Sequence, residues 1–446
     1  MLRRAFVRWI GLILLASVIP HSMPASAGTA NAGYVDFSFY LPSIAGNNAS
    51  PDQILAPTAE KPQSKLWYND GRWWADLFNP AVGAHHIYTL NWATQRWIDT
   101  GVALDTRPRT QADILWDGAH LYVVSGGGLV STGIELDARL YRYSYAARAY
   151  HLDPGFPVKV RTGGAESIVI AKDTAGTLWV TYVQNKQVYV NRSLTSEMQW
   201  GAPFVLPATG ANTSVTADDI AALVASNGMV GVVWSNQSDG TFYYAIHADG
   251  ASATKWSAGV AARGTNFADD HISLKALQAD PAGNLFAVVK TSLNTPNEPN
   301  IVVLVGRRQS GGRLSWKRVS VSNGAQGQTR PILLLDTTNR HMYVITADES
   351  GGNIYYKVGN LDNPSFDPAT KGTLFMSRSS YPFLNNPTST KQNVTAATDI
   401  VVLASYDNLS HPSTSPATSD VYVHNVIPVA ANASTNRHIY IPLLRR

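Results

Sequence analysis

Short apolar runs alternate with turn residues along most of the chain, from residue 64 to residue 428. In the first of these units, residues 66–68 are followed by the turn Asn69-Asp70-Gly71 and by a second apolar run over residues 73–78. Asn-Gly and Asp-Gly pairs between apolar runs are strong hairpin signals, because a type I′ turn needs positive φ at both central positions. The pattern therefore predicts antiparallel strands rather than long helices.

The unit of strand, turn and further strands recurs about every 50 residues, close to the length of a four-stranded propeller blade. Seven first strands are expected to begin near residues 66, 114, 168, 220, 274, 332 and 393. We predict an all-β, seven-bladed β-propeller of four-stranded antiparallel blades, with six blades as the alternative. A β-sandwich or a β-helix is the structural rival, but sandwiches rarely repeat this often and β-helix coils are much shorter.

Composition supports the all-β prediction and narrows the chemistry. Only 15% of residues are charged, and six of the 31 acidic residues are glutamate, which favours helix interiors where aspartate favours turns. The chain has no cysteine, so disulfides, thiolate metal sites and cysteine nucleophiles are excluded. No spacing of histidines and acids along the chain matches a metal site, and we expect neither a metal nor a cofactor.

The amino-terminal segment is typical of an export signal. Arg3, Arg4 and Arg8 precede an apolar run over residues 9–19, and the small-residue site Ala25-Ser26-Ala27 follows. We expect a signal peptide over residues 1–27, cleavage near Ala27/Gly28, and a secreted or cell-surface protein. The paired arginines leave the twin-arginine route open beside the general secretory one.

Removal of this segment also changes the net charge of the protein. Without its three arginines the formal net charge falls from +4 to +1, and composition reveals no basic face. We therefore expect no nucleic-acid partner, no membrane-spanning segment after signal removal, and a monomer.

The two ends of the mature chain have linker composition. Residues 28–63 are assigned to an arm and linker, residues 64–428 to the propeller, and residues 429–446 to a linker and a Tyr-Ile-Pro-Leu-Leu-Arg-Arg tail. Such tails resemble those that end many secreted bacterial proteins. Surface attachment or sorting, and edge strands that close the ring, are the two roles considered for these ends.

Three units end in a tryptophan after a polar turn: residues 196–200, 249–256 and 310–316. These endings resemble eroded Asp-boxes, the Ser-x-Asp-x-Gly-x-Thr-Trp hairpins of sialidase-type (BNR-repeat) propellers. The third-position aspartate is missing from the first and last, and the middle one lacks the serine. The resemblance implies a secreted, carbohydrate-related β-propeller, carried by repeat architecture more than by motif identity.

Candidate functional residues come from the position that leads into each predicted first strand, because these positions share one face of a propeller. All seven are polar, and Asp113, Asp218 and Asp270 stand close by. The predicted ligand-binding residues are Lys65, Gln111, Asp113, Glu166, Asp219, His271, Arg330 and Lys391. Strand ends around a water-filled channel are polar in any case, so a purely structural explanation stays open.

The catalytic candidates within this set are Glu166, Asp219, His271 and Arg330. Glu166 with Asp219 could serve as a glycosidase pair, and His271 with Arg330 or Lys391 could serve a polysaccharide lyase. A sialidase would need three arginines, for which Arg107, Arg109, Arg161, Arg263 and Arg330 are available, and a glutamate-activated tyrosine.

No catalytic motif stands intact, so the function predicted first is binding of an extracellular polar ligand, most plausibly a glycan, at the channel mouth. A carbohydrate-active enzyme is the alternative, either a sialidase-like glycoside hydrolase or a polysaccharide lyase. The second alternative is a structural cell-envelope protein whose partners are proteins.

Overall fold

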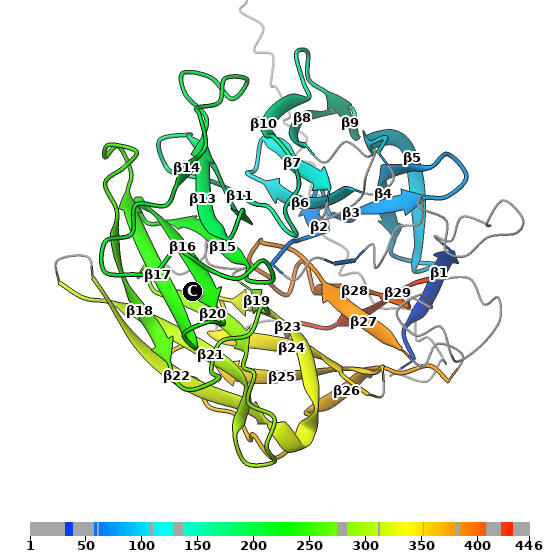
Figure 1. Cartoon of the computed structure of the whole chain (residues 1–446). Coiled ribbons are helices and arrows are strands. Elements are labelled where there is room, and N and C mark those ends of the chain that lie inside the picture. The colour runs from blue at the N-terminus through cyan, green and yellow to red at the C-terminus, as the bar shows by residue number, and fades with distance from the viewer. Residues whose placement is uncertain are drawn as a thin grey trace, which may run out of the picture.

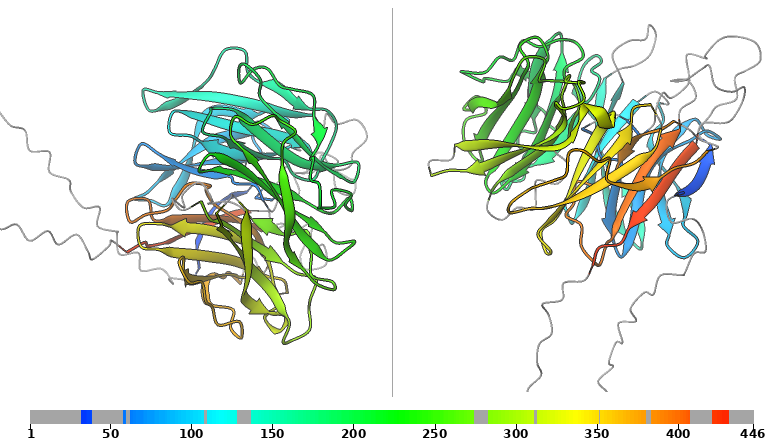
Figure 2. Two further views of the ribbon diagram at one scale, coloured as in Figure 1. Left: turned by 90° about the vertical axis from the view of Figure 1, so that its left-hand side faces the viewer. Right: turned by 90° about the horizontal axis from the view of Figure 1, so that it is seen from below.

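The computed structural model describes residues 32–38, 58–59, 62–107, 110–127, 137–273, 283–310, 313–350, 352–379, 383–406 and 421–430. Their strands form seven antiparallel sheets around a common centre, as Figures 1 and 2 show. One short 3-10 helix, η2 (Gly324–Gln326), accompanies the strands in this part of the chain. The predicted seven-bladed β-propeller of four-stranded antiparallel blades is confirmed.

The first three blades follow the chain from the innermost strand to the outermost. Blade 1 contains β2 (Leu66–Asn69), β3 (Arg72–Asn79), β4 (Ala84–Asn91) and β5 (Arg96–Asp105). Blade 2 contains β6 (Thr110–Trp116), β7 (His120–Gly127), β8 (Ala138–Ala146) and β10 (Val158–Arg161), with β9 (Ala149–Leu152) also paired to β8. Blade 3 contains β11 (Val169–Lys172), β12 (Leu178–Gln184), β13 (Gln187–Arg192) and β14 (Phe204–Val205).

The next three blades repeat this order. Blade 4 contains β15 (Ala221–Ser226), β16 (Met229–Asn236), β17 (Thr241–Ala248) and β18 (Ser257–Arg263). Blade 5 contains β19 (Ile272–Ser273), β20 (Leu285–Lys290), β21 (Pro299–Arg308) and β22 (Leu314–Asn323). Blade 6 contains β23 (Gln328–Asp336), β24 (His341–Asp348), β25 (Ile354–Asn360) and β26 (Thr373–Met376).

Blade 7 combines both ends of the chain. Its inner strands are β27 (Leu384–Thr388), β28 (Ile400–Tyr406) and β29 (Val421–Ile427), and its outermost strand is β1 (Tyr34–Ser38), which pairs antiparallel with β29. Residues 34–38 lie in the segment that the sequence assigned to an arm and linker, so part of that segment belongs to the propeller. This pairing supplies the outer edge of blade 7 and joins the two ends of the ring.

The hairpin turns have the geometry that the sequence predicted. Asp70 and Gly71 between β2 and β3 have φ of 51° and 71°, and Asn227 and Gly228 between β15 and β16 have φ of 50° and 73°. Positive φ at both central positions is the requirement of a type I′ turn, which glycine meets without cost and asparagine or aspartate tolerates.

The apolar residues are buried between successive blades. One continuous cluster runs from Val169 of blade 3 to Val344 of blade 6. Trp67, Trp73 and Trp74 of blade 1 are almost completely buried, so they pack between blades instead of offering rings to a ligand. A blade apolar on both faces is stable only when neighbours cover it, which explains the repeat of β-branched and aromatic runs.

The seventh unit departs from its predicted boundaries. Its first strand is β27, at residues 384–388, where the sequence placed one near residue 393. The strand contains Pro387 and a bulge between Asn385 and Thr388, so it lacks the continuous apolar run that marks the other first strands. Lys391 consequently follows the first strand of blade 7 instead of leading into it.

Gln111 and Arg330 also lie differently from the prediction. They fall inside β6 and β23 instead of ahead of them, because both strands begin earlier than their apolar runs. The predicted signal peptide and the carboxyl-terminal tail beyond residue 430 lie outside the described residues. No helix in the described part of the chain is long and apolar enough to cross a membrane.

Candidate functional site

The predicted site residues separate into two groups. In an antiparallel blade, the start of the first strand and the connection from the second strand to the third lie at one end. Residues from blades 1, 2 and 7 form one group, which we call the inner network: Lys65, Gln111, Asp113 and Lys391. Residues from blades 3 to 5 form the other.

The inner network is built around two buried lysines. Lys65 Nζ donates to Gln63 Oε1 at 3.0 Å, to Gln111 Oε1 at 3.2 Å and to the carbonyl of Ala112 at 2.5 Å. Lys65 is 1% exposed. Its ammonium is thus satisfied by groups of the protein itself, which is the condition for burying a charge.

Lys391 forms the second half of the inner network. Its Nζ pairs with Asp113 and donates to the carbonyl of Ile170 at 2.6 Å. Burial lowers the pKa of Lys391 even though Asp113 favours the charged form. Asp113 also accepts the backbone N–H groups of Ser64 and Ile170, each at 2.8 Å.

These contacts join blades 1, 2, 3 and 7 at the centre of the ring. Residues 62–65 run through the same region, and the carbonyl of Ser64 accepts the N–H of Ile114. We assign Lys65, Gln111, Asp113 and Lys391 to stabilising the ring, because their polar groups are turned onto one another and onto backbone groups.

Asp219 has a local role of the same kind. It is fully buried, and its carboxylate accepts the N–H and hydroxyl of Thr216, at 2.8 and 2.9 Å, and the N–H of Gln237 at 3.1 Å. These bonds order the loop that precedes β15. The neighbouring Asp218 is exposed and its carboxylate is the one that approaches the other acids.

The second group, which we call the mouth cluster, consists of Glu166, Asp218, Asp269, Asp270 and His271. Oxygens of Glu166, Asp218 and Asp270 lie within 4.8 Å of one another although they come from the loops before β11, β15 and β19. Three carboxylates this close repel each other unless a cation, a proton or a donor group lies between them. Blades 3, 4 and 5 thus deliver negative charge to one place.

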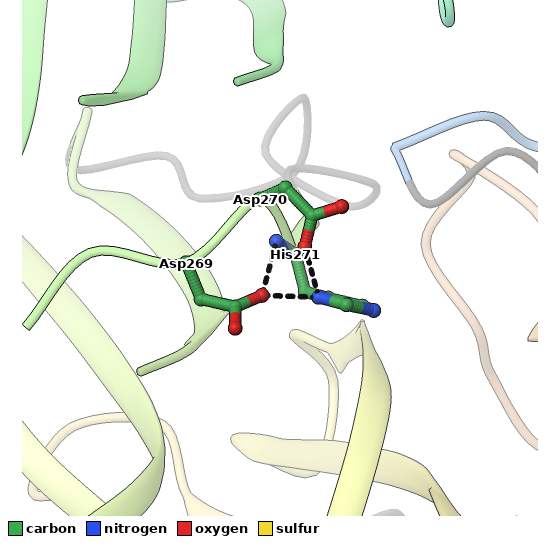
Figure 3. Close-up of side chains that lie close together, drawn as sticks. All are labelled: Asp269, Asp270 and His271. Atoms are coloured by element: carbon green, nitrogen blue, oxygen red, sulfur yellow. Dashed lines mark hydrogen bonds and ion pairs between the residues drawn. The ribbon is translucent and has the colours of Figure 1, made fainter. Parts of the chain in front are cut away.

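His271 is held by the two aspartates that precede it. Its Nδ1 contacts Asp269 Oδ1 and lies 2.5 Å from Asp270 Oδ1, as Figure 3 shows. Its Nε2 lies 3.5 Å from the hydroxyl of Thr329 in β23. The ring is 7% exposed, so its orientation is fixed by these partners. Because both carboxylates lie at Nδ1, Nε2 is the ring nitrogen that points away from them.

Arg330 follows Thr329 directly and has an unusual backbone. It lies at a bulge of β23, between Thr329 and Ile332, with φ of 48°. Bulges are common next to functional sites, where they redirect a side chain, and positive φ in a residue other than glycine costs about 1 to 3 kcal/mol. Its Nε is buried and makes no hydrogen bond with any residue that the structure describes.

A cation also contacts Asp269. Lys290, the last residue of β20, approaches Asp269 Oδ2 at 3.4 Å and Glu349 of the neighbouring blade at 3.5 Å. The cluster therefore combines carboxylates and an imidazole with a neighbouring lysine. Asp269 and Lys290 were not predicted, because neither occupies the position immediately before an apolar run.

The donors of the mouth cluster are also those that could hold a metal ion. Two groups of three meet the distance requirement: Asp269, Asp270 and His271, and Glu166, Asp218 and Asp270. Oxygen ligands alone suit a hard cation such as Ca²⁺ or Mg²⁺, and an added imidazole suits a transition metal. The first group consists of three consecutive residues, whereas the second is assembled from three blades and could not be indicated by spacing along the chain.

The arginines considered for a sialidase have other partners. Arg107 pairs with Asp105, and Arg161 donates to the carbonyls of Gly163 and Gly127. Burial lowers the pKa of Arg161 to about 10. Arg263 donates to Thr241 and Tyr243, and Arg109 lies outside the described residues.

A tyrosine–glutamate contact exists, but at the opposite end of the propeller. Tyr122 donates to Glu197 at 2.6 Å, in a network with Lys172 and Arg142. Burial raises the pKa of Tyr122, the reverse of what a tyrosine nucleophile needs. These contacts do not supply the groups that the sialidase alternative required.

The comparisons with known proteins confirm the fold. No family model matches the chain, and no curated protein matches it. Among solved structures, an ulvan lyase of polysaccharide lyase family PL25 has a TM-score of 0.50 at 8% identity, covering 84% of this chain and 94% of its own. Hydrazine synthase of Kuenenia stuttgartiensis gives 0.45 at 11% identity, covering 72% and 81%.

The NanB sialidase of Streptococcus pneumoniae is also similar, with a TM-score of 0.34 at 12% identity. The match covers 72% of this chain and 50% of the sialidase chain. Sialidases and other carbohydrate-active propellers thus stand among the structural neighbours. Identities this low establish the shared fold alone, since one fold serves many functions.

Proposed function

We propose that this protein is exported and binds a glycan at the mouth cluster. One observation carries the proposal: Glu166, Asp218 and Asp270 bring their carboxylates within 4.8 Å from three successive blades. Acids assembled in this way cost stability, and such groups are usual where a protein binds or reacts with something.

The chemistry of the site favours a sugar over an apolar ligand. Carboxylates accept hydrogen bonds from neighbouring hydroxyl groups, and Lys290 provides a cation beside Asp269. A glycan that carries a carboxylate is matched by Arg330, which forms no ion pair with the residues that the structure describes. The Asp-box resemblance and the export signal in the sequence point to the same extracellular class of ligand.

The test is a screen of the secreted protein against uronate polymers, sialosides and neutral glycans, with binding and product release measured together. Because the cluster could also hold a cation, each screen is run once with EDTA and once with calcium chloride. Glu166→Gln and Arg330→Ala should each weaken binding of the recognised glycan by about 1 to 3 kcal/mol. Failure of the intact protein to bind any glycan would contradict the proposal and favour the structural envelope role.

A second candidate function is β-elimination from a uronate, and the position of His271 favours it. Two aspartates hold its Nδ1, the arrangement that orients an imidazole for proton transfer through Nε2. His271 would take the proton from the carbon next to the uronate carboxylate while Arg330 neutralises that carboxylate. The bond to the 4-oxygen then breaks, the leaving oxygen takes up a proton, and a carbon–carbon double bond remains.

This second function has its own readout, because the unsaturated product absorbs ultraviolet light. In an elimination reaction, His271→Gln should abolish product release and leave glycan affinity within a few-fold, since general-base catalysis contributes roughly 10²- to 10⁴-fold. Binding without any product release would exclude the lyase and keep the binding function.

A further inference from the structure

A hollow lies on the rim of blade 6, far from the mouth cluster. It is formed by β25, the start of β26 and the connection between them, with a volume of about 720 Å³. The connection from the third strand to the fourth lies at the end of a blade opposite to the start of its first strand. The hollow is therefore at the other end of the propeller from Glu166 and His271.

Two glycines give the hollow its shape. A Cβ atom on Gly359 would come within 2.6 Å of the Phe366 ring, so only glycine allows this ring to lie against β25. Gly372 has φ of 90°, and a Cβ there would lie 2.5 Å from the carbonyl oxygen of Tyr356. The backbone is thus arranged to place an aromatic ring and a strand edge around an open space.

The lining combines the groups that bind sugars. Phe366 provides an aromatic ring that can stack on the apolar face of a pyranose, and it lies on the same face of β25 as Lys357 and Gly359. Thr370 adds a hydroxyl, and Asp367 adds a carboxylate that already accepts the N–H of Ala369. Aromatic faces with a few convergent polar groups are typical of small-ligand sites.

Lys357 is the donor of the hollow. Its Nζ is held by two backbone carbonyls, Val321 at 2.5 Å and Asp367 at 2.8 Å, and it forms no ion pair with the described residues. Burial lowers the pKa of Lys357 to about 8. A lysine fixed by two neutral acceptors has a third N–H to offer, and Asp367 offers an acceptor at the same wall.

We propose that this hollow is a second carbohydrate site, which takes a neutral pyranose unit through Phe366, Lys357 and Asp367. One positive and one negative side chain line it, so it has no net charge to attract an acidic group, and the donor and acceptor match two adjacent hydroxyls. The site is separate from the mouth cluster and does not depend on the function proposed there.

The experiment measures binding of fluorescently labelled xylo-, cello- and manno-oligosaccharides to the full secreted chain. Lys357→Met and Phe366→Leu, which keeps an apolar side chain but removes the ring, should each weaken binding of at least one of these neutral sugars roughly 10-fold. Lys255→Met is the matched control, because Lys255 is an exposed lysine in the corresponding connection of blade 4 and should leave binding unchanged. Thermal melting of each variant shows whether it is folded.

A second measurement does not depend on a variant. The low pKa makes Lys357 one of the more reactive lysines toward reductive methylation near pH 7.5, and a bound neutral oligosaccharide should slow its modification relative to Lys255. Absence of binding to all three neutral sugar series, binding by the Lys357→Met and Phe366→Leu variants equal to that of the intact protein, or unchanged methylation would overturn the proposal. Glu166→Gln should leave this binding intact, which separates it from failure of the mouth cluster.

Discussion

The inner network and the mouth cluster differ in how their charges are arranged. In the inner network, Lys65 and Lys391 donate to oxygens of their own chain, and Asp113 is bonded by a lysine and two backbone N–H groups. In the mouth cluster, three carboxylates from three blades lie within 4.8 Å of one another. Opposite charges meet in the first region, whereas like charges are also brought together in the second.

The comparison teaches that polarity at a propeller mouth is not by itself a sign of function. A buried charge must be paired or heavily hydrogen-bonded, and the inner network meets this condition with groups of its own chain. The mouth cluster also holds three carboxylate oxygens within 4.8 Å of one another, and a cation or the hydroxyl groups of a ligand would relieve their repulsion. Substitutions should therefore cost stability in the first region and affinity in the second.

The largest effect is expected from Asp113→Asn. This change keeps the shape but leaves the buried ammonium of Lys391 without its carboxylate, and removing one partner of a buried pair costs about 3 to 5 kcal/mol. Denaturant unfolding of the variant measures the loss. A double variant with Lys391→Met should recover part of it, and a loss below about 1 kcal/mol for Asp113→Asn would contradict a paired, buried network.

A smaller loss is expected from Lys65→Met. The substitution preserves the aliphatic stem but removes the donor from Gln63, Gln111 and the carbonyl of Ala112. Buried acceptors left without a donor cost about 1 to 3 kcal/mol in the free energy of unfolding. Glycan affinity at the mouth cluster should not change. A variant that loses affinity but keeps full stability would instead assign Lys65 to the binding site.

The sequence predicted the propeller because each blade repeats signals that act locally. Asn-Gly and Asp-Gly turns, apolar runs and a constant spacing are sufficient to define hairpins and their number. The sequence did not predict β1 in blade 7 or the start of β27. Strand β1 is short and lies far from its partner along the chain. Strand β27 contains Pro387 and a bulge, so it lacks a continuous apolar run.

The site was predictable only in part, for a geometric reason. Position before a first strand identified Glu166 and His271, which the structure brings into one cluster, and also Asp219, which turns into its own loop. Adjacent residues such as Asp218 and Asp219 point in different directions, and local hydrogen bonds decide which one reaches the mouth. The pairing of Lys391 could not be predicted either, since its partner Asp113 is remote in sequence.

The backbone at Arg330 allows a test that separates strain from binding. Arg330→Ala and Arg330→Gly both remove the guanidinium, so both should lower glycan affinity by about 1 to 3 kcal/mol. Only glycine accepts φ of 48° without strain, so the glycine variant should be more stable than the alanine variant by about 1 kcal/mol. Equal stability of the two variants would show that the backbone at residue 330 is not strained.

The smallest effect, and the one with the opposite sign, is expected from Asp218→Asn. Asp218 is exposed and contributes one of three mutually repelling carboxylates, so its neutralisation should raise the melting temperature slightly, by about 1 to 2 °C. Calorimetry of the protein without ligand measures this shift, and it should shrink at high salt because an exposed charge is screened. A decrease in melting temperature for Asp218→Asn would mean that its carboxylate is satisfied in the free protein, and the distinction between the two regions would fail.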